Sequence, residues 1–145
     1  MRFMVLVKAT AASEKGLVPS DEKMLNEMGK FNEELMKAGV MLEGEGLHPS
    51  SKGVRVQFGG KGKSKVTDGP FAETKELVAG FWVWQVKSRD EAVEWLKRAP
   101  FLEGDVVELR QIFEVADFVA AGIPVDNEAL AKEAEMREQL KNKKG

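Results

Sequence analysis

The sequence has no cysteine and, among its 145 residues, a single histidine, His48. Without cysteine the chain can form no disulfide framework, no thiol nucleophile and no cysteine-containing zinc site. A serine hydrolase triad is disfavoured as well, because no serine lies in a nucleophile-elbow motif. Chemistry on this chain must therefore come from carboxylates, amines, guanidinium groups, hydroxyls or His48.

Long apolar runs and an excess of one charge are also missing. The chain holds 22 basic and 24 acidic side chains, for a net charge of −2. Nucleic acids and anionic membranes normally select a clustered basic excess, and no stretch approaches the roughly 20 apolar residues of a membrane span. We expect one globular, cytoplasmic domain with neither nucleic acid nor membrane as a partner.

Two glycine-rich segments match nucleotide-binding loops only in part. Residues 62–64 (GKS) look like the end of a phosphate-binding loop, but Gln57 stands where its first glycine belongs. Residues 44–46 (GEG) begin like a dinucleotide motif, but Pro49 occupies the third glycine position. We expect no nucleotide cofactor.

Hydrophobic patterning predicts the order of strands and helices, since strands alternate apolar residues and helices repeat them every three or four positions. The predicted elements are a strand at 2–8, a helix from about 20 to 38, a strand at 40–46, a hairpin of 54–58 with 64–68, a strand at 81–86, a helix opened by the Ser88/Glu91 capping box, a strand at 106–113 and a helix at 127–143. This order indicates a ferredoxin-like α+β subunit, an antiparallel sheet with two helices on one face.

The strand at 81–86 is apolar on both of its faces. Helices cover only one of them, so either Phe81 with Val83 or Trp82 with Trp84 needs other cover, and a second copy is the simplest source. The uncovered face would also carry polar residues of neighbouring strands. By alternation these are Lys8, Arg55, Gln57, Glu108 and Arg110. We therefore predict a homodimer with an interior pocket, in which Arg110 or Arg55 holds an anionic substrate.

The turn after the hairpin presents a carboxylate. Asp68 ends a strand and precedes Gly69 and Pro70, which fix the turn geometry, and three ionisable residues (Glu73, Lys75 and Glu76) follow. Such a group suits general acid–base catalysis. In the alternative, Asp68 only accepts backbone hydrogen bonds in an Asx-turn and the following charges form a solvated face. A hard cation is a third option, but the spacing is not diagnostic, and we assign no metal site.

His48 lies in a loop before Pro49. A lone loop histidine is usually an ordinary surface residue. If the hairpin folds back on this loop, His48 and Asp68 would form an acid–base pair.

Several segments together resemble the DGPF branch of the YciI-like (YCII-related) family. The central one is residues 66–76 (VTDGPFAETKE), followed by 79–82 (AGFW). Supporting segments are 44–51 (GEGLHPSS), 86–95 (VKSRDEAVEW) and 107–111 (VELRQ). The resemblance runs from residue 1 to about Phe118, which suggests a domain at 1–122 and a separate charged helical tail at 123–145.

The resemblance implies a dimeric α+β barrel. It also implies a relation to a dehydrochlorinase of chloroaromatic breakdown, a catalytic His/Asp pair in the wider family, and an association with extracytoplasmic-function sigma factors. Carried over by position, the Asp of the DGPF motif is Asp68.

Together these patterns favour a small-molecule enzyme or binder with a pocket inside the dimer barrel, performing a lyase- or isomerase-type proton transfer without a cofactor. Asp68 and His48 are the candidate catalytic residues. The candidate substrate-binding residues are Arg110, Arg55, Glu73, Lys75 and Trp84. The alternative is a non-catalytic ligand-binding or regulatory protein associated with a sigma factor.

Overall fold

The computed structural model describes residues 1–144. It divides into two compact units, the first from Met1 to Gln111 and the second beginning at Ile112. The domain boundary predicted at Gly122 stays a prediction. Within residues 1–144 no helix combines the length and the hydropathy needed to cross a bilayer.

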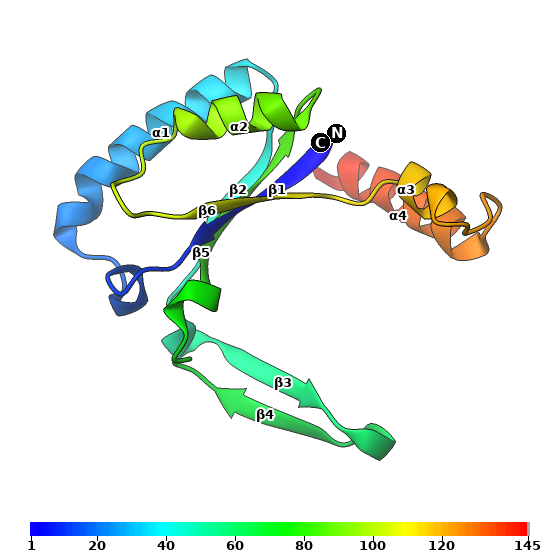
Figure 1. Cartoon of the computed structure of the whole chain (residues 1–145), viewed down its shortest axis with the longest axis horizontal. Helices are drawn as coiled ribbons and strands as arrows, with labels where there is room; N and C mark the ends of the chain where they lie inside the picture. The colour runs from blue at the N-terminus through cyan, green and yellow to red at the C-terminus, as the bar shows by residue number, and fades with distance from the viewer. Residues whose placement is uncertain (145) are drawn as a thin grey trace. The chain divides into compact units, whose positions relative to one another are not determined.

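A four-stranded antiparallel sheet forms the centre of the first unit. The strands of this sheet are β1 (Arg2–Lys8), β2 (Met41–Gly46), β5 (Val78–Gln85) and β6 (Val107–Gln111). Two helices, α1 (Glu22–Lys37) and α2 (Arg89–Lys97), accompany them. The strand order is β2-β5-β1-β6. Figure 1 shows α1 and α2 together on one face of this sheet. The predicted mixed α+β fold with an antiparallel sheet is confirmed.

The core lies between the sheet and the helices. Phe3 pairs with Trp84 and Val5 with Trp82 across β1 and β5, so these four side chains share one face of the sheet. Val5 and Trp84 are completely buried, and α1 adds Phe31, whose ring meets both indoles edge-on. Apolar burial of this kind is the main source of stability in a small domain.

The two core tryptophans differ in their polar atoms. Trp82 Nε1 donates to Asn32 Oδ1 at 2.9 Å, whereas Trp84 Nε1 has no hydrogen-bond partner within residues 1–144. The Trp82 indole also lies against Gly44, where a Cβ would come within 2.6 Å of the ring. A side chain at position 44 would therefore displace Trp82.

The opposite face of the sheet carries no helix within residues 1–111. Met4 and Leu6 of β1 and Phe81 and Val83 of β5 lie on this face and are only partly buried. Of the two options left by the sequence, the structure therefore places Phe81 and Val83 on the uncovered side.

A second, two-stranded sheet lies between β2 and β5 in the chain. It consists of β3 (Val54–Phe58) and β4 (Ser64–Asp68), which pair only with each other. The chain turns at their tip through Lys61 and Gly62, both with positive φ. Every residue of the two strands is exposed. The predicted hairpin is present, but it does not extend the main sheet.

The second unit is helical. It contains α3 (Val115–Ala120), which the sequence did not predict, and α4 (Glu128–Lys144). Phe113 packs on Phe118 with ring centroids 5.2 Å apart. Asn127 Oδ1 accepts the backbone N–H of Ala129 at 2.9 Å at the start of α4.

Candidate functional site

The turn that follows β4 is held against the loop that precedes β3. The Gly69 N–H donates to the Gly53 carbonyl at 3.0 Å, and a Cβ on Gly69 would lie 1.7 Å from the Ser50 carbonyl oxygen. Only glycine fits at so close an approach. The next peptide, Gly69–Pro70, is cis. Close packing against Ser50 therefore explains why the DGPF motif has glycine at this position.

Ser50 links this turn to a third segment. Its Oγ donates to the Glu14 carboxylate, its N–H donates to Glu14 Oε1 at 3.0 Å, and the Phe71 N–H donates to its Oγ at 3.1 Å. The two bonds from Ser50 hold the pKa of Glu14 below its ordinary value, because they stabilise the charged carboxylate. Sequence analysis missed Glu14 and Ser50, since they are separated by 36 residues and neither belongs to a local motif.

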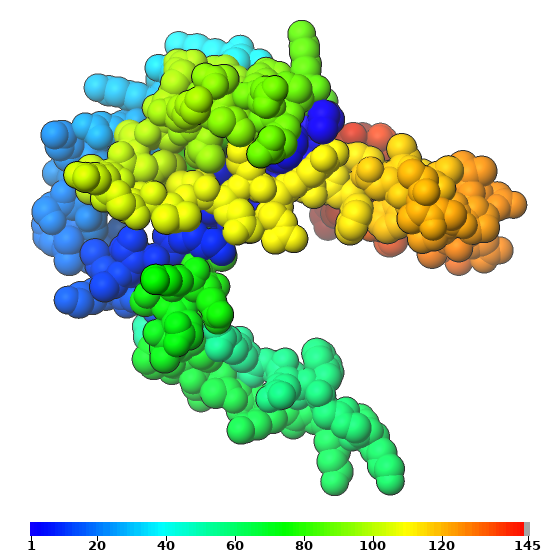
Figure 2. All heavy atoms as spheres, viewed as in Figure 1, coloured from blue at the N-terminus to red at the C-terminus, as the bar shows by residue number. Residues whose placement is uncertain are grey.

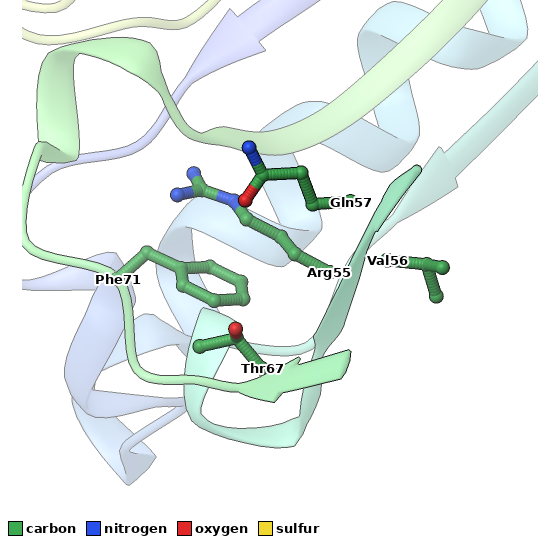
Figure 3. A pocket seen from close by; sticks show the side chains of 5 residues that line it. All are labelled: Arg55, Val56, Gln57, Thr67 and Phe71. Atoms are coloured by element: carbon green, nitrogen blue, oxygen red, sulfur yellow. The ribbon is translucent and has the colours of Figure 1, made fainter. Parts of the chain in front are cut away.

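Phe71 and Arg55 define one side of the hairpin. The Arg55 guanidinium carbon lies 3.8 Å from the centroid of the Phe71 ring, a cation–π contact. Together with Val56, Gln57 and Thr67 they line a hollow of about 470 Å³. Figure 3 shows the Arg55, Gln57 and Phe71 side chains grouped together, with Val56 pointing away from them. Within residues 1–144 no carboxylate pairs with Arg55, so its charge is available to an anion.

Asp68 lies on the other face of the hairpin. It pairs with Val54, while Thr67 pairs with Arg55, and alternation places the Asp68 side chain opposite to that of Arg55. The Asp68 side chain is exposed and makes no hydrogen bond or ion pair within residues 1–144. The Asx-turn bonds of the alternative interpretation are therefore not present.

His48 is brought near this turn by its loop, but not into contact with Asp68. It is exposed and lies two residues before Ser50, whose carbonyl touches Gly69. No side-chain bond joins His48 to Asp68 or to any other residue among 1–144. The structure thus brings the two segments together without assembling the predicted pair.

The other predicted site residues are dispersed. Glu73 and Lys75 are exposed in the short turn after Phe71. Arg110 pairs with Glu108 at 3.3 Å on the uncovered face of the main sheet. Trp84 is fully buried between sheet and helices. Because its side chain has no exposed surface, Trp84 is available for packing in the core, and its assignment to substrate binding stays a prediction.

The close approach at Gly69 generates a first prediction. Gly69→Ala should destabilise the fold by about 1–3 kcal/mol, since the added methyl group overlaps the Ser50 carbonyl. Gly60→Ala is the matched control, because nothing lies within 4 Å of a Cβ at that position. Urea unfolding of both variants measures the difference, and equal stabilities would contradict the contact.

The Ser50 bonds generate a second prediction. Because the pKa of Glu14 is lowered in the folded state, its stabilising contribution is complete above the ordinary carboxyl pKa and is lost as Glu14 protonates. Ser50→Ala should therefore melt below the wild type at pH 7, and the gap should narrow as pH falls below about 4. Ser51→Ala is the control, because the Ser51 hydroxyl makes no bond within residues 1–144. A gap that is independent of pH would contradict the assignment.

Comparison with known proteins gives a family and one relative by sequence. The model of the YCII-related domain matches residues 1–116. "Uncharacterized protein R00369" of Rhizobium meliloti (strain 1021) is 30% identical over 77 residues, which are 53% of this chain and 61% of that protein. The chain thus aligns with less than two thirds of that relative's length.

A solved structure shows a weaker likeness. It is 5-chloro-2-hydroxyhydroquinone dehydrochlorinase from Burkholderia phenoliruptrix AC1100 in complex with 2,5-dihydroxybenzoquinone, 17% identical, with a TM-score of 0.42 over 79% of this chain and 96% of that one. The family resemblance noted in the sequence is confirmed by the domain match, whereas the DGPF branch stays a prediction. The chain belongs to the YCII-related domain family.

Proposed function

We propose that this protein binds a small organic anion at the Arg55 hollow and acts on it by proton transfer. The observation that carries the proposal is the Arg55 guanidinium, which is held against Phe71 and has no carboxylate partner within residues 1–144. A guanidinium forms paired hydrogen bonds with carboxylate or other planar oxyanions. Gln57 and Thr67 add neutral hydrogen-bonding groups beside it.

Asp68 is the proposed general base. Its carboxylate has no bond to break before it can accept a proton, and the turn that presents it is fixed through Gly69 and Ser50. In a lyase-type step Asp68 would take a proton from the substrate, and the electron pair of that bond would form a double bond as a leaving group such as chloride departs with its own pair. In an isomerase-type step the proton would return to another substrate atom. His48 is the proposed partner for proton exchange.

A homodimer completes the proposed site. Asp68 and Arg55 lie on opposite faces of the hairpin, so one copy does not present both to the same bound anion, and the proposed reaction requires the second copy to bring its own Asp68 to the Arg55 hollow. The uncovered sheet face, with Leu6, Phe81 and Val83, supports the association of two copies, because partly exposed apolar groups gain from burial. We propose that the second copy closes the pocket, as in a dimeric α+β barrel.

One observation favours the competing function of a non-catalytic partner-binding protein. The face of the hairpin that carries Asp68 also carries Val54, Val56 and Val66, and these exposed apolar side chains are typical of an interaction surface. A regulatory protein that binds a sigma factor would use such a surface and would need no free carboxylate. The two proposed functions predict different effects of substituting Asp68.

Asp68→Asn is therefore the direct test of catalysis. The folded state should keep its stability within about 0.5 kcal/mol, because the Asp68 side chain makes no bond within residues 1–144. Turnover of any substrate should fall about 100-fold or more, the usual contribution of a general base. Unfolding and activity are measured on the same preparation, and retained turnover would exclude Asp68 as the base.

The anion site is tested by binding. In a thermal-shift screen of phenolic and halogenated organic acids, we expect some of them to raise the melting temperature of the wild type. Arg55→Gln should abolish that rise. Lys65→Gln is the control, because Lys65 lies on the same face of the hairpin but outside the hollow. A rise that survives in Arg55→Gln would place the anion elsewhere.

A further inference from the structure

Strand β6 ends the main sheet, and its outer side is unpaired. In the strand order β2-β5-β1-β6 it pairs with β1 alone. The Lys8 N–H donates to the Val106 carbonyl at 3.0 Å, so alternation directs the backbone groups of Glu108 and Arg110 towards β1. The backbone N–H and C=O groups of the alternate residues point away from the sheet. These residues are Val107, Leu109 and Gln111. Within residues 1–144 no strand pairs with this outer edge.

The β6 edge is regular, whereas the opposite edge of the sheet is not. Edge strands are commonly protected from further pairing by bulges, proline or a covering segment. The opposite edge strand, β2, contains two glycines and a register shift between Met41 and Glu43. Strand β6 contains neither glycine nor proline and pairs with β1 without a register shift. Figure 2 shows the β6 segment, coloured yellow, at the surface of the first unit. Strand β6 is therefore the edge suited to accept another strand.

The two charged residues of β6 are placed symmetrically about Leu109. Glu108 and Arg110 both lie on the uncovered face of the main sheet, with side chains 40% and 71% exposed. When two β6 strands run antiparallel with Leu109 at the centre, Glu108 of each copy lies opposite Arg110 of the other. Opposite charges directly across two strands stabilise their pairing. The strand is thus electrostatically complementary to a second copy of itself.

Charge also selects this register over the neighbouring ones. The outward-pointing backbone groups of two β6 strands meet only when the pairing shifts by two residues at a time. Pairing centred on Glu108 would place two carboxylates opposite each other, and pairing centred on Arg110 would place two guanidinium groups opposite each other. Like charges in directly opposite positions destabilise a sheet. Centring on Leu109 avoids both and pairs all five residues of each strand.

We propose that β6 pairs antiparallel with β6 of a second copy, with the two-fold axis at Leu109, so that two four-stranded sheets join edge to edge. The backbone groups of Leu109 then bond to Leu109 of the other copy, and those of Val107 bond to Gln111. Two-fold symmetry makes every other contact occur twice. This contact uses the edge of the sheet, so it is separate from the sheet-face homodimer of the proposed function and does not depend on it.

The backbone bonds provide the affinity of this contact, and the charges provide its register. Exposed ion pairs contribute little by themselves, because water and salt screen them. The Glu108 carboxylate already lies 3.8 Å from Lys8 Nζ and 3.3 Å from Arg110 Nη1, so a second copy extends an existing network. A five-residue strand covers less than the roughly 800 Å² per partner of a standard interface. We therefore expect a reversible association that increases with protein concentration.

Disulfide trapping tests the register, because the chain has no cysteine of its own. In the proposed pairing positions 108 and 110 are directly opposite, with Cα atoms about 4.5 Å apart, which a disulfide can span. A mixture of Glu108→Cys and Arg110→Cys should therefore form covalent heterodimers on mild oxidation. Each variant alone should form few homodimers, because identical positions are diagonal neighbours roughly 7–8 Å apart.

Lys23→Cys mixed with Arg110→Cys is the control for chance collision, since the Lys23 side chain is 87% exposed and lies on α1. Heterodimers of the two β6 variants that are no more abundant than in this control would overturn the edge contact. Homodimers of either β6 variant that are as abundant as the heterodimers would overturn the register centred on Leu109.

Charge reversal tests the ion pairs by sedimentation of the full chain. Glu108→Arg and Arg110→Glu should each weaken self-association about tenfold, because like charges then face each other across the two strands. The combined variant Glu108→Arg/Arg110→Glu exchanges the two charges and should restore association to the wild-type level. Single variants that associate like the wild type, or a combined variant as weak as the single ones, would overturn the proposed pairing. A dimer that persists while no heterodimer is trapped would overturn the edge contact and leave the sheet-face homodimer in place.

Hydrogen exchange gives a readout within the strand itself. The amides of Glu108 and Arg110 bond to β1 and should be protected at every protein concentration. The amides of Val107, Leu109 and Gln111 point outward and should become protected as the concentration rises. Exchange at these three amides that does not slow with concentration would overturn the pairing of β6 with a second copy.

Discussion

The contact between Gly69 and the Ser50 carbonyl is the constraint on which the candidate site depends. It holds the turn after β4 against the loop before β3, and the bond from the Phe71 N–H to Ser50 Oγ extends this attachment two residues further along the turn. Phe71 in turn supports the Arg55 guanidinium. The positions of Asp68 and Arg55 are therefore set by backbone packing at the base of the hairpin rather than by the hairpin strands alone.

The motif containing Asp68 combines features that sequence reasoning treated as alternatives. Its glycine and phenylalanine are structural, since one permits the close approach and the other donates to Ser50. Its aspartate has no structural bond within residues 1–144. It is therefore free for the proton transfer proposed above.

Local patterns predicted the fold because its determinants are local. The Ser88/Glu91 box, for example, is formed as expected, with Ser88 Oγ accepting from the Glu91 N–H at 3.1 Å and Glu91 accepting from the Lys87 N–H at 2.7 Å. The site was harder to predict because its contacts join distant segments, as Glu14 and Ser50 do. The side of the sheet on which Trp84 lies could not be predicted either, because β5 is apolar on both faces and periodicity alone cannot tell which face the helices cover.

The insertion point of the hairpin has a consequence for how such proteins diverge. β2 and β5 are adjacent in the main sheet, so the chain leaves the sheet and returns to it at neighbouring strands. The length and composition of the inserted segment can change without shifting the register of any core strand. Substitutions in the hairpin strands therefore leave the contacts of the tryptophan core intact, so the surface can vary while the scaffold stays the same.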